Sequence, residues 1–270
     1  MMKNSFLNEL RLNLENNNIE NIEDIINEYG DFFNIGYEAG LTDEEILVKL
    51  GSIDDIVNKF INVESFEIVN SYNVNIHSVV IDKVNFIRST NPGLDYAIDT
   101  NLEELPIEVT LSNNTLTVKD ILKENYKGRV ELDIIIGSDV TFDNIKVELI
   151  SGTITGDSIS GKNITLKTIS GHILVNNITC YDLNCSVISG RIDFKILEVY
   201  NMLYVNNVSG DIRITTITCN NGKVSSVSGK ITILDYDTNN IKVSSVTGEI
   251  AGLYNTVKNT LRKTFGKFYK

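Results

Sequence analysis

Cysteine and histidine are scarce in this sequence. The three cysteines, Cys180, Cys185 and Cys219, are odd in number and form no CxxC pair, which argues against a disulfide framework and favours a reducing compartment. The two histidines, His77 and His172, lie far apart in the sequence, so no catalytic dyad is predicted. We expect the cysteines to be small buried residues and the histidines to be solvated, with no metal site and no cofactor.

Long apolar runs are absent as well. No window approaches the roughly 18 apolar residues of a membrane span, and residues 1–15 carry charges where a signal peptide needs an apolar core. Basic residues are outnumbered, and the net charge of -12 argues against direct binding to nucleic acid or anionic lipid. The exception is residues 253–270, which are basic. We therefore expect a cytoplasmic protein, with membrane contact only through this tail.

Catalytic signatures are missing too. No serine lies in a Gly-x-Ser-x-Gly elbow, and the glycines do not gather before a helix as a phosphate-binding loop requires. Residues 235–240, DYDTNN, resemble the start of a calcium loop, but the glycine of the sixth place is missing and Val246 replaces the bidentate glutamate, so we interpret them as a polar corner. The sequence favours a protein that is not an enzyme. A carbohydrate-active solenoid enzyme is a remote alternative.

A repeat dominates the second half of the chain. The pattern Ile/Val-Ser/Thr-Gly ends at Gly152, Gly171, Gly190, Gly210, Gly229 and Gly248, with spacings of 19, 19, 20, 19 and 19 residues. A unit of this length cannot close a core alone, but stacked units pair their backbones and pile like residues into a continuous interior. The repeat therefore predicts a β-solenoid with coils of 19–20 residues.

Four apolar columns accompany the glycines, and we expect them to form that interior. Two residues after each glycine stand Ile154, Ile173, Ile192, Ile212, Ile231 and Ile250, and two before it Ile150, Ile169, Ile188, Val208, Val227 and Val246. The other two columns are Ile159, Ile178, Leu197, Ile217 and Tyr236, and Leu166, Cys185, Val205, Val224 and Val243. Period-2 alternation within each strand sends every second side chain inward.

Polar residues recur at fixed places in the same units. Asparagines stand between the predicted strands at Asn163, Asn201, Asn220 with Asn221, and Asn239 with Asn240. We interpret these positions as corners, where asparagine, like glycine, tolerates left-handed backbone. Directly after the glycines, Arg191, Asp211, Lys230 and Glu249 alternate in sign, and Asp193 is expected to face Arg213. Opposite charges in neighbouring coils indicate that the coils stack in register.

The remaining segments complete a two-domain α+β organisation. Residues 1–62 have helical periodicity and form a predicted α-helical bundle, in which Thr42 and Glu45 make a capping box and a further short helix begins at Ser52. Residues 63–252 form the solenoid domain, in which 63–150 are irregular lead-in strands and 151–252 the regular repeats. Residues 253–270 predict a basic amphipathic helix, which caps the last coil or contacts a membrane.

Two resemblances follow from these segments. "FLNELRLNLE" and "EDIINEYGDFFNIGYEAGLTDEEILVKLGSIDDI", within residues 3–60, resemble the bacterial HAAS-type helical domain, although Ile53 stands where that family usually has proline. The repeats "VSGDIRI", "VSGKITI" and "VTGEI" are similar to the bacterial β-solenoids of the "putative adhesin" family. The resemblance implies a signalling or envelope-stress accessory linked to PadR-type transcription regulators, without enzymatic activity.

The functional hypothesis combines these points. We expect a binding or scaffold protein whose helical head contacts a PadR-type regulator and whose solenoid mediates docking or self-association into a homo-oligomer. The head carries 13 acidic groups, and Glu23, Asp24 and Glu28, along the polar side of its long helix, are the predicted contacts to a basic partner surface. A solvated acidic surface without a partner is the plainer interpretation of these residues. A cell-surface adhesin is the alternative function.

Overall fold

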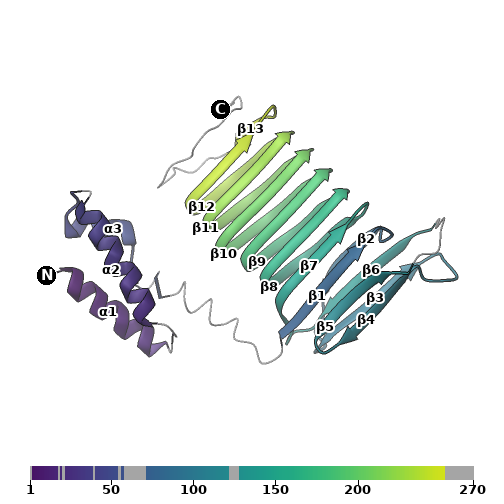
Figure 1. Cartoon of the computed structure of the whole chain (residues 1–270), viewed down its shortest axis with the longest axis horizontal. Coiled ribbons are helices and arrows are strands. Elements are labelled where there is room, and N and C mark those ends of the chain that lie inside the picture. The colour runs from purple at the N-terminus through teal and green to yellow at the C-terminus, as the bar shows by residue number, and fades with distance from the viewer. Residues whose placement is uncertain are drawn as a thin grey trace. The chain divides into compact units, whose positions relative to one another are not determined.

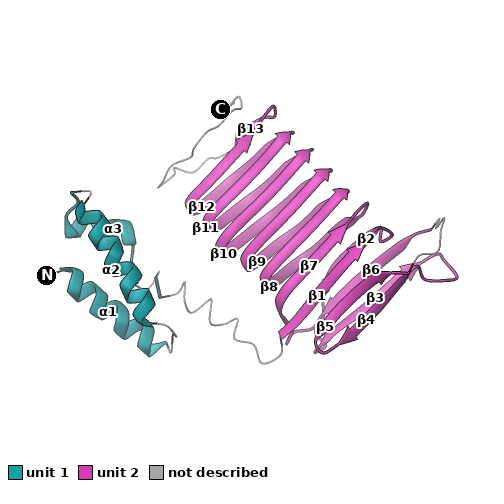
Figure 2. Ribbon diagram, viewed as in Figure 1, with its two compact units in different colours: residues 1–67 teal, residues 68–270 magenta. Residues whose placement is uncertain are grey.

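The structure, a computed structural model, describes residues 2–17, 19, 22–38, 40–53, 56–57, 71–121 and 128–252. The chain divides into two compact units, residues 1–67 and 68–270 (Figure 2). The first is helical and the second is a β-solenoid, so the predicted α+β fold class is confirmed. The predicted helix at 253–270 lies outside the described residues. Within those residues, no helix is long and apolar enough to cross a membrane.

The helical unit contains α1 (Met2–Asn16), α2 (Ile22–Glu38) and α3 (Asp43–Leu50). The capping box predicted before α3 is present, because Thr42 Oγ1 accepts a hydrogen bond from the Glu45 backbone and Glu45 Oε2 accepts one from the Thr42 backbone. Most of the short helix predicted from Ser52 lies outside the described residues. The helices bury one apolar cluster, which includes Phe6, Leu10, Leu14, Ile25, Ile26, Phe33 and Ile46.

The second unit is a 13-stranded, mostly parallel sheet wound into coils (Figure 1). Its first strands are β1 (Ser71–Ser78), β2 (Lys83–Arg88), β3 (Leu94–Thr100), β4 (Ile107–Ser112), β5 (Thr115–Asp120), β6 (Val130–Ile136) and β7 (Thr141–Leu149). The regular repeats follow as β8 (Thr153–Ser170), β9 (Ile173–Ser189), β10 (Ile192–Ser209), β11 (Ile212–Ser228), β12 (Ile231–Ser245) and β13 (Ile250–Gly252). Strands β7 to β13 pair in sequence order, each with the next.

The coils stack in the register that the repeat predicts. Ile212 pairs with Ile192 on one side and with Ile231 on the other. Three of the four predicted apolar columns are buried: the column two residues after the glycines, the column that contains Leu197 and the column that contains Val205. Because like residues stack on like, one continuous core extends through the solenoid.

The fourth column does not belong to the core, and the prediction for it was wrong. Its exposed fractions range from 37% for Ile150 to 63% for Val246. We call this column the ridge; it consists of Ile150, Ile169, Ile188, Val208, Val227 and Val246. The glycine corner explains the difference, because Asn207 and Ile212 both point inward and the four residues between them form the turn. Period-2 alternation therefore fails across the corner.

Close packing of the backbone explains the glycine column. A Cβ atom on Gly210 would lie 2.0 Å from the carbonyl oxygen of Gly190, and one on Gly190 would lie 1.7 Å from that of Gly171. Gly210 also has a φ of 129°, which side-chain-bearing residues rarely adopt. The corners thus require glycine mainly because successive coils touch there.

The lead-in strands start the solenoid in an order that departs from the sequence. The coil made by β1 and β2 lies between the coil made by β5 and β6 and the coil made by β7 and the start of β8. On the far side of the coil made by β5 and β6, β4 pairs antiparallel with β5 and β3 pairs antiparallel with β6. These two strands cover the first open edge of the stack, as a capping role requires (Figure 1).

Candidate functional site

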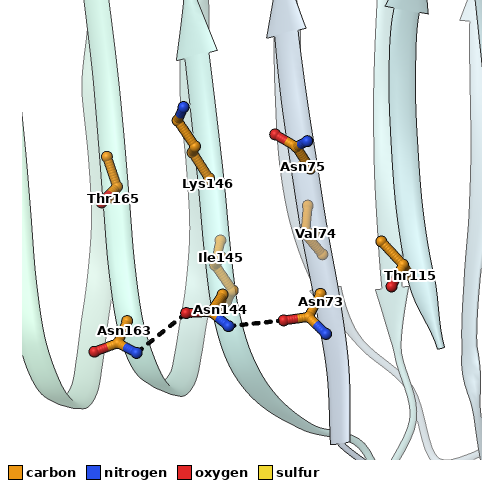
Figure 3. A pocket seen from close by; sticks show the side chains of 9 residues that line it. All are labelled: Asn73, Val74, Asn75, Thr115, Asn144, Ile145, Lys146, Asn163 and Thr165. Atoms are coloured by element: carbon orange, nitrogen blue, oxygen red, sulfur yellow. Dashed lines mark hydrogen bonds between the residues drawn. The ribbon is translucent and has the colours of Figure 1, made fainter.

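A row of side-chain amides follows one flank of the solenoid. Asn144 Nδ2 donates to Asn73 Oδ1 at 2.9 Å, and Asn163 Nδ2 donates to Asn144 Oδ1 at 3.1 Å (Figure 3). One coil further, Asp182 lies in register with Asn163, and its Oδ1 atom accepts from Asn201 Nδ2 at 2.8 Å. We call this row the amide ladder.

The ladder corrects the predicted reason for the recurring asparagines. Among the described residues other than glycine, only Asn113 and Asn114 have positive φ, and they join β4 to β5. Asn163 and Asn201 therefore do not have left-handed backbone, and Asn201 lies at a register shift between Val199 and Met202. The amide side chain is both a donor and an acceptor, so Asn163 can bond to Asn144 in the coil before it, whereas Asn201 and Asn220 donate to the Asp182 carboxylate and the Tyr200 carbonyl.

Two open hollows lie along this flank and meet at Asn163 and Thr165. The first measures about 490 Å³ and contains the ladder residues Asn73 and Asn144 (Figure 3). The second measures about 460 Å³ and extends to Asp182. The remaining lining residues are Val74, Asn75, Thr115, Ile145 and Lys146 in the first, and Ile164, Leu183, Asn184, Asn201, Met202 and Tyr204 in the second. Uncharged side chains, both polar and apolar, line most of each hollow.

The charged side chains around Glu148 on this flank form ion pairs with one another. Glu148 lies 3.1 Å from Lys167 Nζ, 3.3 Å from Lys146 Nζ and 3.5 Å from His77 Nδ1. Partial burial raises the pKa of Glu148, but hydrogen bonds from the two lysines outweigh it and hold the pKa below its ordinary value of 4.5. The ionised form of Glu148 is therefore stabilised, which suits an ion-pair network better than proton transfer.

An aromatic group adds a second kind of contact at the far end. Lys223 Nζ lies 5.3 Å from the centre of the Tyr204 ring, which is half-buried in the second hollow. Asp182, the carboxylate of this hollow, already accepts hydrogen bonds from Asn201 Nδ2 and Met202 N. The described lining thus offers hydrogen bonds and a ring face to a ligand, and it brings no two carboxylates together for acid and base roles.

The predicted head residues differ in their surroundings. Glu23, Asp24 and Glu28 are all exposed on α2. Glu23, however, forms an ion pair with Arg11 of α1, which donates from both terminal nitrogens, one of them at 3.0 Å, and lowers the pKa of Glu23. Glu23 thus joins α1 to α2, a role that the sequence did not reveal.

The three cysteines and two histidines do not come together in one site. Cys180, Cys185 and Cys219 are buried in the core as predicted, and burial raises the pKa of each thiol, for Cys219 to about 12. His77 and His172 are both exposed, and His172 Nδ1 accepts a hydrogen bond from the Arg191 backbone. The described residues contain no metal-binding cluster of three or more His, Cys, Asp or Glu side chains.

Residues 235–240 were predicted to form a polar corner, and two of them lie between the inward-pointing Thr238 and Ile241. The whole segment lies within β12, where Tyr236 and Thr238 point inward and Asp235 and Asp237 outward. The alternation is that of a strand with one buried face. A calcium-binding loop needs a sharp turn, whereas these residues belong to a strand.

Comparison with known proteins bears on the solenoid. No curated protein matches the chain. The crystal structure of a "putative adhesin" from Bacteroides fragilis is similar to it, with a TM-score of 0.45 and 16% identity over 70% of this chain and 88% of that chain. The Toastrack DUF4097 family model matches residues 99–262, and the HAAS-type resemblance of residues 3–60 lies outside that match and stays a prediction. Since the match spans more than half of the sequence, the chain belongs to the Toastrack DUF4097 family.

Proposed function

We propose that this protein is a non-enzymatic scaffold of a bacterial signalling or envelope-stress system. In this proposal the solenoid serves docking and self-association, and the helical unit contacts a transcription regulator of the PadR type. One observation carries the scaffold role: the outward rows repeat coil after coil, so the solenoid offers a long, regular surface on a rigid core. Such surfaces are typical of repeat proteins that bind other macromolecules.

The charge of the helical unit supports the proposed partner. A DNA-binding regulator must carry a basic surface, and Asp24 and Glu28 lie one helical turn apart on the exposed side of α2. Glu23 is a weaker candidate because its charge is already paired with Arg11. We therefore assign the contact to Asp24 and Glu28, with Glu23 as a residue that holds the helices together.

Titration of the full chain into the co-encoded regulator tests the assignment. Asp24→Lys with Glu28→Lys should abolish binding while the helix content is retained, and added salt should weaken binding of the native chain. Glu9→Lys with Glu15→Lys, a pair of equal charge on the exposed part of α1, is the matched control and should bind. If both variants lose binding equally, only net charge matters. If Asp24→Lys with Glu28→Lys binds as well as the native chain, Asp24 and Glu28 are not the contact.

Cell fractionation tests the location that this role requires. The proposal places the protein in the cytoplasm, where a transcription regulator is accessible. Recovery of the intact chain from the cell surface or the culture medium would refute this location and favour an adhesin-like function instead.

A further inference from the structure

The ridge is an apolar strip on the outside of the solenoid. Its six side chains, Ile or Val in every coil from Ile150 to Val246, are between 37% and 63% exposed. Solvent-exposed positions of a strand are ordinarily polar, and contiguous exposed apolar patches mark interaction sites. Because the coils are in register, the ridge is straight and its residues follow at the strand spacing of about 4.8 Å.

We propose that the ridge is the contact between two copies of this chain, which pack antiparallel about a two-fold axis. This inference rests on the self-association in the proposed function and names the surface that performs it. A straight, regular strip is complementary to itself, as an isologous interface requires. A stable interface buries about 800 Å² on each partner. Six half-exposed aliphatic side chains provide less than that, so the rows beside the ridge must take part.

The neighbouring charges select the orientation. Three residues after each of the last four ridge residues, at the same corner, stand Arg191, Asp211, Lys230 and Glu249, which alternate in sign. With the two-fold axis between the corners of Gly210 and Gly229, Asp211 faces Lys230 of the second copy, and Arg191 faces Glu249. A parallel arrangement would place each charge opposite its own copy, where like charges repel.

The same axis matches four of the six ridge residues, Ile188, Val208, Val227 and Val246. Val208 faces Val227 of the second copy, and Ile188 faces Val246, so branched aliphatic side chains meet along the interface. Within one copy, Lys230 Nζ already lies 2.9 Å from Glu249 Oε1. The second copy would extend this pair at both ends, through Asp211 and Arg191, into a network of four charges.

The oligomeric state of the full chain tests the ridge. Sedimentation equilibrium at micromolar concentrations should give a dimer for the native protein and a monomer for Val208→Glu with Val227→Glu. The matched control is Ile196→Glu with Leu234→Glu, which changes two equally exposed apolar residues outside the ridge and should remain dimeric. Thermal denaturation of each variant confirms that it is folded. A native monomer, or a ridge variant that remains dimeric, would overturn the proposal.

A charge inversion tests the orientation. The fourfold variant Arg191→Glu, Asp211→Lys, Lys230→Glu and Glu249→Lys keeps every antiparallel pair opposite in sign and should dimerise with itself. In a mixture with the native chain, native mass spectrometry should show heterodimers at least about fivefold below the statistical share, because like charges then face each other. Heterodimers at or above the statistical share would overturn the antiparallel pairing.

Two further measurements separate this inference from its alternatives. If the native chain is monomeric and removal of residues 253–270 produces dimers, the tail covers the ridge and the proposal is wrong. Regulator binding is measured on the same samples. A monomer that binds the regulator through Asp24 and Glu28 refutes the ridge dimer alone, whereas a dimer that does not bind it refutes the role of the helical unit.

Discussion

Asn207 donates a hydrogen bond of 2.8 Å from its Nδ2 atom to the carbonyl oxygen of Gly190, from one corner of the solenoid to the corner before it. Asn207 is fully buried. At the equivalent place one coil later, the hydroxyl of Ser226 is buried and has no hydrogen-bond partner among the described residues. Asn207 thus combines a bonded amide nitrogen with an amide oxygen that has no partner among the described residues, whereas Ser226 carries only an unbonded hydroxyl.

We expect Asn207→Ala to lower the free energy of unfolding by about 1–3 kcal/mol, because the Gly190 carbonyl loses a buried donor. Ser226→Ala should change it by less than about 0.5 kcal/mol or raise it, since the hydroxyl contributes no bond. Urea denaturation of both variants measures the difference. Equal destabilisation by the two substitutions would contradict a role for the bond.

The glycine corner gives the second prediction. Gly210→Ala should destabilise the solenoid by at least about 2 kcal/mol, because the new methyl group meets the Gly190 carbonyl oxygen and the φ of 129° is strained for alanine. The control is Gly30→Ala in α2, where the nearest atom, Leu7 Cδ1, is 4.0 Å away and alanine favours the helix. Thermal denaturation should show a lower melting temperature for Gly210→Ala only.

The stack of isoleucines in the core gives the third prediction. Ile231→Asp places a carboxylate in the core between Ile212 and Ile250 and should cost more than about 3 kcal/mol. Leu234→Asp changes an exposed residue three positions on and should cost less than about 1 kcal/mol. Chemical denaturation of both variants checks this, and similar stability would rule out the stack.

The buried thiols give the fourth. Because burial raises the pKa values of Cys180, Cys185 and Cys219, little thiolate exists at neutral pH and the native protein should react slowly with a thiol reagent. All three should react once the chain is unfolded in denaturant. Thr218→Cys, an exposed neighbour of Cys219, should add one fast-reacting thiol. Fast labelling of the native chain would contradict the buried positions.

The ion-pair network gives the fifth. The pKa of Glu148 is lower in the folded state than its ordinary value of 4.5, so its contribution to stability is complete above that pH and is lost as the pH falls through the folded pKa. Glu148→Gln should therefore be less stable than the native protein at pH 7, and the difference should shrink well below pH 4.5. Denaturation at several pH values measures it, and a difference that does not depend on pH would refute the network.

The sequence predicted the interior of the solenoid better than its outside. Ile212 and Val208 both recur every coil and both flank Gly210 by two residues, so periodicity treats them alike. Only the path of the corner separates them, because the turn contains an even number of residues between inward positions and so shifts the alternation. The ridge is thus a consequence of backbone geometry that a repeat alone does not encode.

Other features depend on contacts distant in the sequence. The pairing of β1 with β7 joins Asn73 to Asn144, and no period connects those residues. The recurring asparagines were visible in the sequence, but left-handed corners and amide ladders both favour asparagine, and only the structure distinguishes them. Glu23 gave no signal of its bond to Arg11, because either residue could equally be a solvated charge on its helix.

The alternating corner charges give the solenoid an electrostatic repeat twice as long as its structural repeat. Removal of the single coil that carries Asp211 would place Arg191 beside Lys230 and reverse the sign of every later position relative to the earlier ones. Removal of two adjacent coils would preserve the order of signs. Relatives that keep a charged surface of this kind should therefore gain and lose coils in pairs, so that even a rigid stack has a preferred unit of evolutionary change.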